Sequence, residues 1–273
     1  MKRAGRIVAA ALLLSMVPAV ANAQVDPNYH WKTDPVSKVM AGKPFADRVL
    51  NRVPGSFFDA NPVNPAARAA VGRGTSLYGP GTPIYVGQFG MCTVTAAGWD
   101  AAGRKIALTA GHCGNVGELV AAADSLEAGY SGRIVRKNGA LDYAVIELGP
   151  NAEVTGSYNG TTIRSLGGWA KTGDTLCKNG YATGVTCGVT WASEPARHIT
   201  QVCAMEGDSG APVYAGGRLV GMINGGILPQ QVNLSCHTPL QGGFHAPTVS
   251  RNIDAVMRDL NATPGPGQGF RLA

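Results

Sequence analysis

The chain has 273 residues, 45% of them hydrophobic and 15% charged, and a formal net charge of +6. Residues 1–23 carry three basic and no acidic side chains, residues 24–74 carry seven basic and four acidic ones, and residues 75–273 carry thirteen of each sign. The larger C-terminal part is therefore neutral and lacks the basic excess that nucleic-acid binding requires, so we expect no nucleic-acid partner.

The first 23 residues have the pattern of a secretory signal peptide. Three basic residues precede an apolar stretch over 7–20, and a small-residue cleavage site comes next at Ala21-Asn22-Ala23. The apolar stretch is shorter than the ~20 residues that a spanning helix needs, and no later stretch is longer. We expect a secreted, extracellular protein with no membrane contact in the mature form, or a periplasmic one in a host with two membranes.

Residues 24–74 differ from the rest of the chain in proline content and in the spacing of their apolar residues. Six prolines interrupt this stretch, and its apolar residues show no sustained period. Two interpretations stay open: a propeptide that is removed, or an N-terminal extension that is kept. Gly79–Pro83 is rich in glycine and proline, which is typical of a linker into a folded domain over 75–262.

From residue 84 onward, short apolar runs separated by turn residues predict strands. The expected strands cover 84–88, 92–97, 106–109, 133–136, 141–148, 188–192, 212–214, 219–224 and 243–246. Asn-Gly pairs at 138–139, 159–160 and 179–180 predict hairpin turns. Many short strands with abundant glycine favour an all-β sandwich or barrel.

The end of the chain has a different pattern. Apolar residues at 249, 253, 256 and 260 have helical spacing, with Thr248 or Ser250 as the expected cap. Residues 263–273 are predicted to form a flexible tail.

Three residues lie in motifs suited to nucleophilic catalysis. His112 comes after Thr109-Ala110-Gly111, Asp142 lies in the apolar run 140–148, and Ser209 lies in Gly207-Asp208-Ser209-Gly210. A hydroxyl needs an adjacent imidazole to take its proton and a carboxylate to orient that imidazole. The order His, Asp, Ser excludes the α/β-hydrolase and subtilisin arrangements.

The apolar context of Asp142 indicates a buried strand with apolar residues on both faces. A buried carboxylate needs a hydrogen-bond donor, and the His112 ring is the expected partner. Gly207 and Gly210 permit a tight turn around Ser209, and the N–H groups of Gly207 and Ser209 are expected to form an oxyanion hole.

Six cysteines in an exported chain indicate three disulfides, with fifteen pairings open to the sequence alone. No Cys-x-x-Cys spacing points to zinc, so we expect neither a metal nor another cofactor.

The paired motifs around His112 and Ser209 show that residues from about Thr82 to Leu260 resemble the chymotrypsin-like serine endopeptidases. The segments 177–188 and 224–226, together with Gly111, resemble the bacterial secreted branch, which includes the streptogrisins and α-lytic protease.

The resemblance implies two antiparallel β-barrels with a cleft between them and a short C-terminal helix. It places His112 and Asp142 on the first barrel and Ser209 on the second. It implies the disulfides Cys92–Cys113, Cys177–Cys187 and Cys203–Cys236.

The resemblance also implies a buried partner for Asp208. The bacterial branch has an arginine at the position of Lys178, and lysine is a point charge without the planar fork of arginine. We expect a Lys178–Asp208 ion pair that shapes the oxyanion hole.

The substrate pocket is expected to include Gln201, Val202, Met205, Asn224, Gly225 and Gly226. No carboxylate lies near 201–202, and position 223 is isoleucine rather than histidine, which disfavours cleavage after basic residues or glutamate. A small or apolar neutral P1 residue remains. Asn224 replaces the usual serine, which leaves open its hydrogen bond to the buried aspartate.

The leading hypothesis is a secreted monomeric serine endopeptidase that acts on polypeptides through an acyl-enzyme. Two alternatives stay open: an inactive homologue that acts as a secreted binding protein, and an exported esterase.

Overall fold

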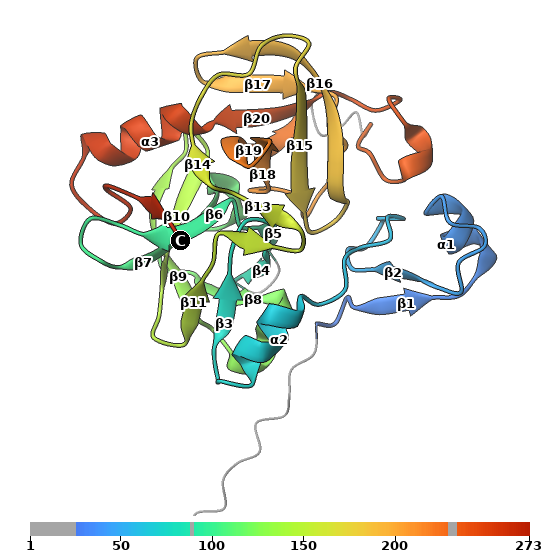
Figure 1. Cartoon of the computed structure of the whole chain (residues 1–273), viewed down its shortest axis with the longest axis horizontal. Helices are drawn as coiled ribbons and strands as arrows, with labels where there is room; N and C mark the ends of the chain where they lie inside the picture. Colours follow the sequence, from blue (N-terminus) through green and yellow to red (C-terminus); the bar gives the residue numbers. More distant parts are fainter. Residues whose placement is uncertain (1–25, 88–89, 229–233) are drawn as a thin grey trace, which may run out of the picture.

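A computed structural model describes residues 26–87, 90–228 and 234–273. Two curved sheets pack against each other, and an N-terminal region lies beside them (Figure 1). The predicted signal peptide, 1–23, lies outside the described residues. Within the described residues, no helix has the length and apolar character needed to cross a membrane.

The first sheet is an open half-barrel with antiparallel pairings and the strand order β21-β6-β7-β10-β9-β8-β4-β5. Its core is built from alternate inward-facing residues such as Ile84, Ile134 and Ile146. Its strands are β4 Pro83–Val86, β5 Gly90–Thr93, β6 Ala96–Trp99, β7 Lys105–Ala110, β8 Leu119–Ala122, β9 Gly132–Asn138, β10 Tyr143–Leu148 and β21 Arg271–Leu272.

The second sheet closes on itself. Its order is β14-β19-β18-β15-β16-β17-β20, and β20 also pairs with β19, which completes a ring of six strands. Its strands are β14 Ser165–Leu166, β15 Thr175–Gly180, β16 Gly184–Glu194, β17 Arg197–Thr200, β18 Pro212–Ala215, β19 Arg218–Gly226 and β20 Thr248–Asn252. The predicted all-β fold, with two antiparallel barrel-like units and a C-terminal helix, is confirmed.

Smaller elements connect and flank the sheets. The N-terminal region contains β1 His30–Lys32, α1 Pro35–Met40, β2 Val49–Asn51, α2 Pro65–Val71 and β3 Ser76–Tyr78. Further short strands are β11 Ala152–Val154, β12 Ser157–Tyr158 and β13 Thr161–Thr162, and 3-10 turns occur at η1 Gly111–Cys113, η2 Ala123–Ala128 and η3 Pro239–Gln241.

The C-terminal helix α3 spans Ile253–Ala262 and begins later than expected. Asn252 caps it by accepting a hydrogen bond from the Asp254 N–H, and Val249 belongs to β20 instead. Ile253, Val256 and Leu260 are buried, as their spacing predicts.

Residues 263–273 do not form a flexible tail. The backbone at 271–272 pairs with β6, and Phe270 is buried in the core beneath α3. The Gly267 N–H donates to the carboxylate of Asp100. The glycine and proline content reflects tight turns in a docked segment, which explains why the sequence resembles a frayed end.

Several expected boundaries were wrong for identifiable reasons. The run 92–97 divides into two strands, because the chain leaves the β4 ladder after Thr93 and pairs with β7 from Ala96. Residues 243–246 form no strand, since the carbonyls of Gly243 and His245 accept from the Gln201 side chain. Gly79–Pro83 is buried rather than an exposed linker.

Two of the three Asn-Gly pairs lie at hairpin turns. Asn138-Gly139 joins β9 to β10, and Asn159-Gly160 joins β12 to β13 with positive φ at both residues. Asn179-Gly180 lies inside β15 instead, and the turn is formed by the next three residues, Tyr181 to Thr183.

Candidate active site

His112, Asp142 and Ser209 meet at the junction of the two sheets. His112 lies in η1 directly after β7, and Asp142 directly precedes β10. Because β7 and β10 pair with Ala110 opposite Tyr143, the sheet register brings the two residues together. Ser209 reaches them from the loop before β18, and its carbonyl accepts from the Thr93 N–H at 2.8 Å.

The three side chains form a continuous hydrogen-bonded row. His112 Nε2 lies 2.8 Å from Ser209 Oγ, and His112 Nδ1 lies 2.9 Å from Asp142 Oδ2. The His112 backbone N–H also donates to Asp142 Oδ1 at 2.8 Å. The carboxylate thus holds both the ring and the backbone of the histidine in one orientation.

Asp142 lies in a turn rather than inside a strand as expected. Its φ is +48°, in the left-handed region, and its side chain is 23% exposed. The sequence pattern missed this because the apolar residues on either side read as one continuous run. Burial alone would raise the pKa of Asp142, but hydrogen bonds from His112 and Asn224 outweigh it, and the pKa lies below its usual value.

Asn224 supplies the hydrogen bond that its departure from serine had left open. Its Nδ2 donates to Asp142 Oδ2 at 2.8 Å and to the Asp142 carbonyl at 2.6 Å. Its Oδ1 accepts from the Arg251 N–H at 2.9 Å, which fixes the orientation of the amide. The longer amide side chain therefore orients the carboxylate from the second sheet.

The backbone around Ser209 requires glycine at two positions. Gly207 has φ +96° and Gly210 has φ +83°, and a Cβ at Gly210 would lie 2.3 Å from Thr109 Oγ1. Within the described part of the chain, neither the Gly207 N–H nor the Ser209 N–H donates a hydrogen bond. Both residues line the cleft beside His112, so two donors are available to a developing oxyanion.

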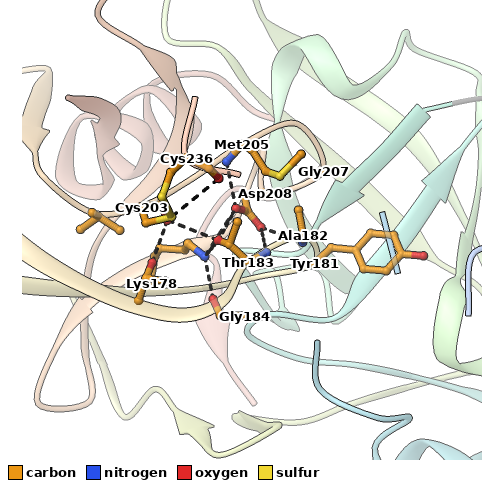
Figure 2. Close-up of polar contacts among 12 residues, drawn as sticks. Lys178, Tyr181, Ala182, Thr183, Gly184, Cys203, Met205, Gly207, Asp208 and Cys236 are labelled. Carbon is orange, nitrogen blue, oxygen red and sulfur yellow. Dashed lines mark hydrogen bonds and ion pairs between the residues drawn. A yellow bond between two sulfur atoms is a disulfide. The ribbon is translucent and has the colours of Figure 1, made fainter. Parts of the chain in front are cut away.

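Asp208, directly before Ser209, is fully buried and densely hydrogen-bonded (Figure 2). Its Oδ1 accepts from the N–H groups of Ala182 and Thr183, at 2.8 and 3.2 Å. Its Oδ2 accepts from Thr183 Oγ1 at 2.6 Å and from the Met205 N–H at 3.1 Å. Four donors therefore fix this side chain below the loop that carries Ser209.

The structure brings Lys178 and Asp208 together inside the second unit, which is the closed barrel of strands β15 to β20. Lys178 Nζ lies 3.5 Å from Asp208 Oδ2, and neither side chain is exposed to solvent. The ammonium group also donates to Thr183 Oγ1 and to the Gly184 carbonyl. Burial lowers the pKa of Lys178 from its ordinary value, and the Asp208 carboxylate opposes that effect.

The cleft beside Ser209 is lined by part of the expected set: Met205, Asn224, Gly225 and Gly226. Gln201 and Val202 do not line it. Val202 is fully buried, and the Gln201 amide turns toward the 243–245 carbonyls. Lining residues that the sequence reasoning missed include Leu228, Leu234, Ala246 and Thr248. The only signal for them was their position around the Asn224-Gly225-Gly226 motif and Cys236.

All six cysteines form disulfides with the pairing that the resemblance implies: Cys92–Cys113, Cys177–Cys187 and Cys203–Cys236. The Cys92–Cys113 disulfide fixes the segment next to His112. The Cys203–Cys236 disulfide ties the loop before Ser209 to the segment that follows the lining residue Leu234. No group of three or more His, Cys, Asp or Glu side chains in the described residues is arranged to hold a metal ion.

Comparisons with known proteins find one curated relative and several solved structures that are similar to this chain. No family model matches the chain. The chain is 28% identical over 165 residues to serine protease 2 of Streptomyces fradiae, which covers 54% of this chain and 92% of the relative.

Solved structures share the fold. A Nocardiopsis protease superposes with a TM-score of 0.54 at 24% identity, and Thermobifida fusca protease A with 0.54 at 22%. These matches cover 67% and 68% of this chain and 96% and 97% of the other chains. About a third of this chain therefore lies outside alignments that span nearly all of the relatives.

The chain thus shares the fold of bacterial chymotrypsin-like proteases and is similar in sequence to a curated serine protease.

Proposed function

We propose that Ser209 is the nucleophile of a secreted endopeptidase, that His112 is its general base and that Asp142 orients the histidine. The observation that carries this proposal is the row of contacts from Ser209 Oγ through the His112 ring to Asp142, at 2.8 and 2.9 Å. Geometry of this kind is what proton transfer from a hydroxyl requires.

In this proposal His112 takes the Ser209 proton as Oγ attacks the substrate carbonyl. The tetrahedral oxyanion accepts hydrogen bonds from the Gly207 and Ser209 N–H groups, each worth about 3 kcal/mol in the transition state. His112 then protonates the leaving amine, which leaves an acyl-enzyme on Ser209. A water molecule, deprotonated by His112, hydrolyses the acyl-enzyme and regenerates the serine.

The lining of the cleft supports a small or apolar neutral P1 residue. Ala204, Ile223 and Leu228 contribute apolar surface, while Glu206, the acidic residue among the described lining residues, is exposed. A lysine, arginine or glutamate in this cleft would lose hydration without a buried partner of opposite charge among the described lining residues, which disfavours those side chains.

Export is supported by the signal pattern of residues 1–23 and by the three disulfides, which persist in oxidising compartments. The proposal includes a polypeptide substrate, a monomeric enzyme and no cofactor.

The test is covalent labelling of the secreted protein with a peptidyl phosphonate, combined with peptide mapping and a P1 library. We expect label on Ser209, loss of several orders of magnitude in rate in Ser209→Ala and His112→Ala, and non-additive effects in the double variant. The matched control is Ser157→Ala, an exposed hydroxyl outside the cleft. Wild-type activity in Ser209→Ala would refute the triad, and turnover of esters without peptide cleavage would favour the esterase alternative.

A further inference from the structure

The residues 26–74, here called the N-terminal segment, are anchored to the first unit by a buried ion cluster. Arg52 contacts Asp124 of η2 at 2.6 Å and Asp26 at 2.7 Å. The three side chains are 2%, 0% and 3% exposed. Removing the segment would take from Asp124 both its Arg52 partner and the backbone donor of Asn64.

The same cluster reaches both units. The hydroxyls of Tyr85 on β4 and Tyr181 in the β15–β16 turn each donate to Asp26 at 2.8 Å. Burial and the neighbouring Asp26 carboxylate raise the pKa of Tyr85 to about 12, so that its hydroxyl remains a donor over the physiological pH range. Asp26 thus joins a strand of the first unit to a turn of the second.

An apolar contact continues this junction toward the cleft. Val53, which is 4% exposed, packs in one cluster with Tyr181, Ala182 and Met205, and Met91 packs against the same cluster. Met91 and Met205 also line the cleft beside Ser209. Val53 approaches Gly207 so closely that a Cβ on that glycine would lie 3.2 Å from Val53 Cγ2.

A chain of hydrogen bonds leads from the segment to Asp208. Ser56 Oγ donates to the Ala182 carbonyl at 2.7 Å, and Ser56 is buried. The Ala182 N–H in turn donates to Asp208 Oδ1 at 2.8 Å (Figure 2). The segment therefore holds the turn that holds Asp208, directly before the nucleophile.

Two further hydrogen bonds join the N-terminal segment to the residues directly after Cys236, which is disulfide-bonded to Cys203. The Phe57 N–H donates to the His237 carbonyl at 2.8 Å, and the Thr238 hydroxyl donates to the Met40 carbonyl. In Figure 1, α1 (blue) accordingly lies near the orange-red segment that contains residues 239–241.

The segment does not obstruct the chemistry. No residue of 26–74 is among the residues that line the cleft, and the His112–Ser209 contact is formed while the segment is docked. The segment therefore contacts residues behind the cleft and does not fill the cleft itself.

We infer that the N-terminal segment remains in the working protease after signal removal, and that Ser56 and Val53 are positioning residues for the loop 205–209 that carries the oxyanion donors. This inference rests on the proposed function. It decides between the two interpretations of 24–74 in favour of a retained extension.

The first test determines the N-terminus of the protein that the phosphonate labels. We expect secreted, labelled enzyme to begin at Gln24. Labelled, fully active enzyme that begins near Thr75 would overturn the inference. Absence of any label on Ser209 would instead show failure of the proposed function, so the two failures are distinguishable.

The second test compares kcat per labelled active site in Ser56→Ala, the conservative Ser56→Thr and the control Ser37→Ala on the outer helix α1. Misplacement of a catalytic group by about 1 Å can cost about a hundredfold in rate. We expect kcat of Ser56→Ala to fall between about tenfold and a hundredfold with KM nearly unchanged.

Ser56→Thr should recover most of that loss, and Ser37→Ala should match the wild type. Val53→Ala provides an independent variant, with the same expected split between kcat and KM. Normal kcat in both Ser56→Ala and Val53→Ala would overturn the positioning role. A purely structural role would lower the number of labelled sites without lowering kcat per site.

Discussion

Replacement of Lys178 by methionine removes the charged group nearest to Asp208 while keeping a side chain of similar length. Loss of one partner of a buried ion pair costs about 3–5 kcal/mol, because the remaining charge stays desolvated. Asp208 keeps four hydrogen-bond donors in the variant, and the Nζ–Oδ2 separation of 3.5 Å is longer than that of a tight pair. We therefore expect a loss near the lower limit, about 3 kcal/mol.

Turnover should fall together with stability in Lys178→Met, because Asp208 positions the adjacent Ser209 and the Gly207 N–H. Urea unfolding measures the first effect, and kcat per labelled site measures the second. Lys178→Arg keeps the charge, and its cost is that of fitting a larger head group into a filled site, about 1–3 kcal/mol.

The order of the two variants decides between charge and packing. Arginine less damaging than methionine would support the ion pair. A Lys178→Met protein with wild-type stability and turnover would refute the reasoning, and Lys178→Arg as the more damaging change would show that packing dominates at this site.

Three further predictions concern the rest of the site and the C-terminus. Asn224→Ala removes a hydrogen bond to the Asp142 carboxylate, and kcat should fall between about tenfold and a hundredfold, since such bonds to charged groups contribute about 1.5–3 kcal/mol; wild-type kcat in this variant would contradict the orienting role. Because the pKa of Asp142 is lowered in the folded state, its stabilising effect is present above the unfolded-state pKa of about 3.9 and is lost as the pH falls through the lower folded-state value. The difference in unfolding free energy between wild type and Asp142→Asn should therefore be largest near neutral pH and shrink toward pH 2, and a difference independent of pH would contradict this sign. Phe270→Ala should lower the free energy of unfolding by about 3 kcal/mol, as measured in urea, because the ring is buried beneath α3; no change would show that the C-terminal segment is not docked.

The motifs around His112 and Ser209 could be recognised in the sequence because each is local. Gly111 and Cys113 flank His112, where a disulfide fixes the backbone, and the glycines at 207 and 210 permit the tight turn around Ser209, so both requirements are visible within five residues. The helix spacing at 253–260 was equally local, although its cap was not: Asn252 caps α3, and the apolar residue at 249 belongs to a strand.

What the sequence could not provide depends on contacts between distant residues. The left-handed conformation of Asp142 is hidden in an apolar run, and the amide of Asn224, 82 residues later, determines how its carboxylate is oriented. Strands β17 and β20 were not predicted because they carry many polar residues, and their pairing partners are set by closure of the second barrel.

The environment of Asp208 depends both on a local sequence motif and on contacts from distant residues. The motif places a carboxylate before Ser209, and this buried charge needs donors and a cation. Lys178 provides the charge without the bidentate geometry of arginine, and the remaining bonds come from the turn at 181–183. That turn is itself held from outside by Ser56, Val53 and the Asp26–Tyr181 bond. The Lys178–Asp208 ion pair and the N-terminal contacts therefore support the same turn, so loss of the N-terminal contacts should make the protein more sensitive to substitution of Lys178 than either change alone implies.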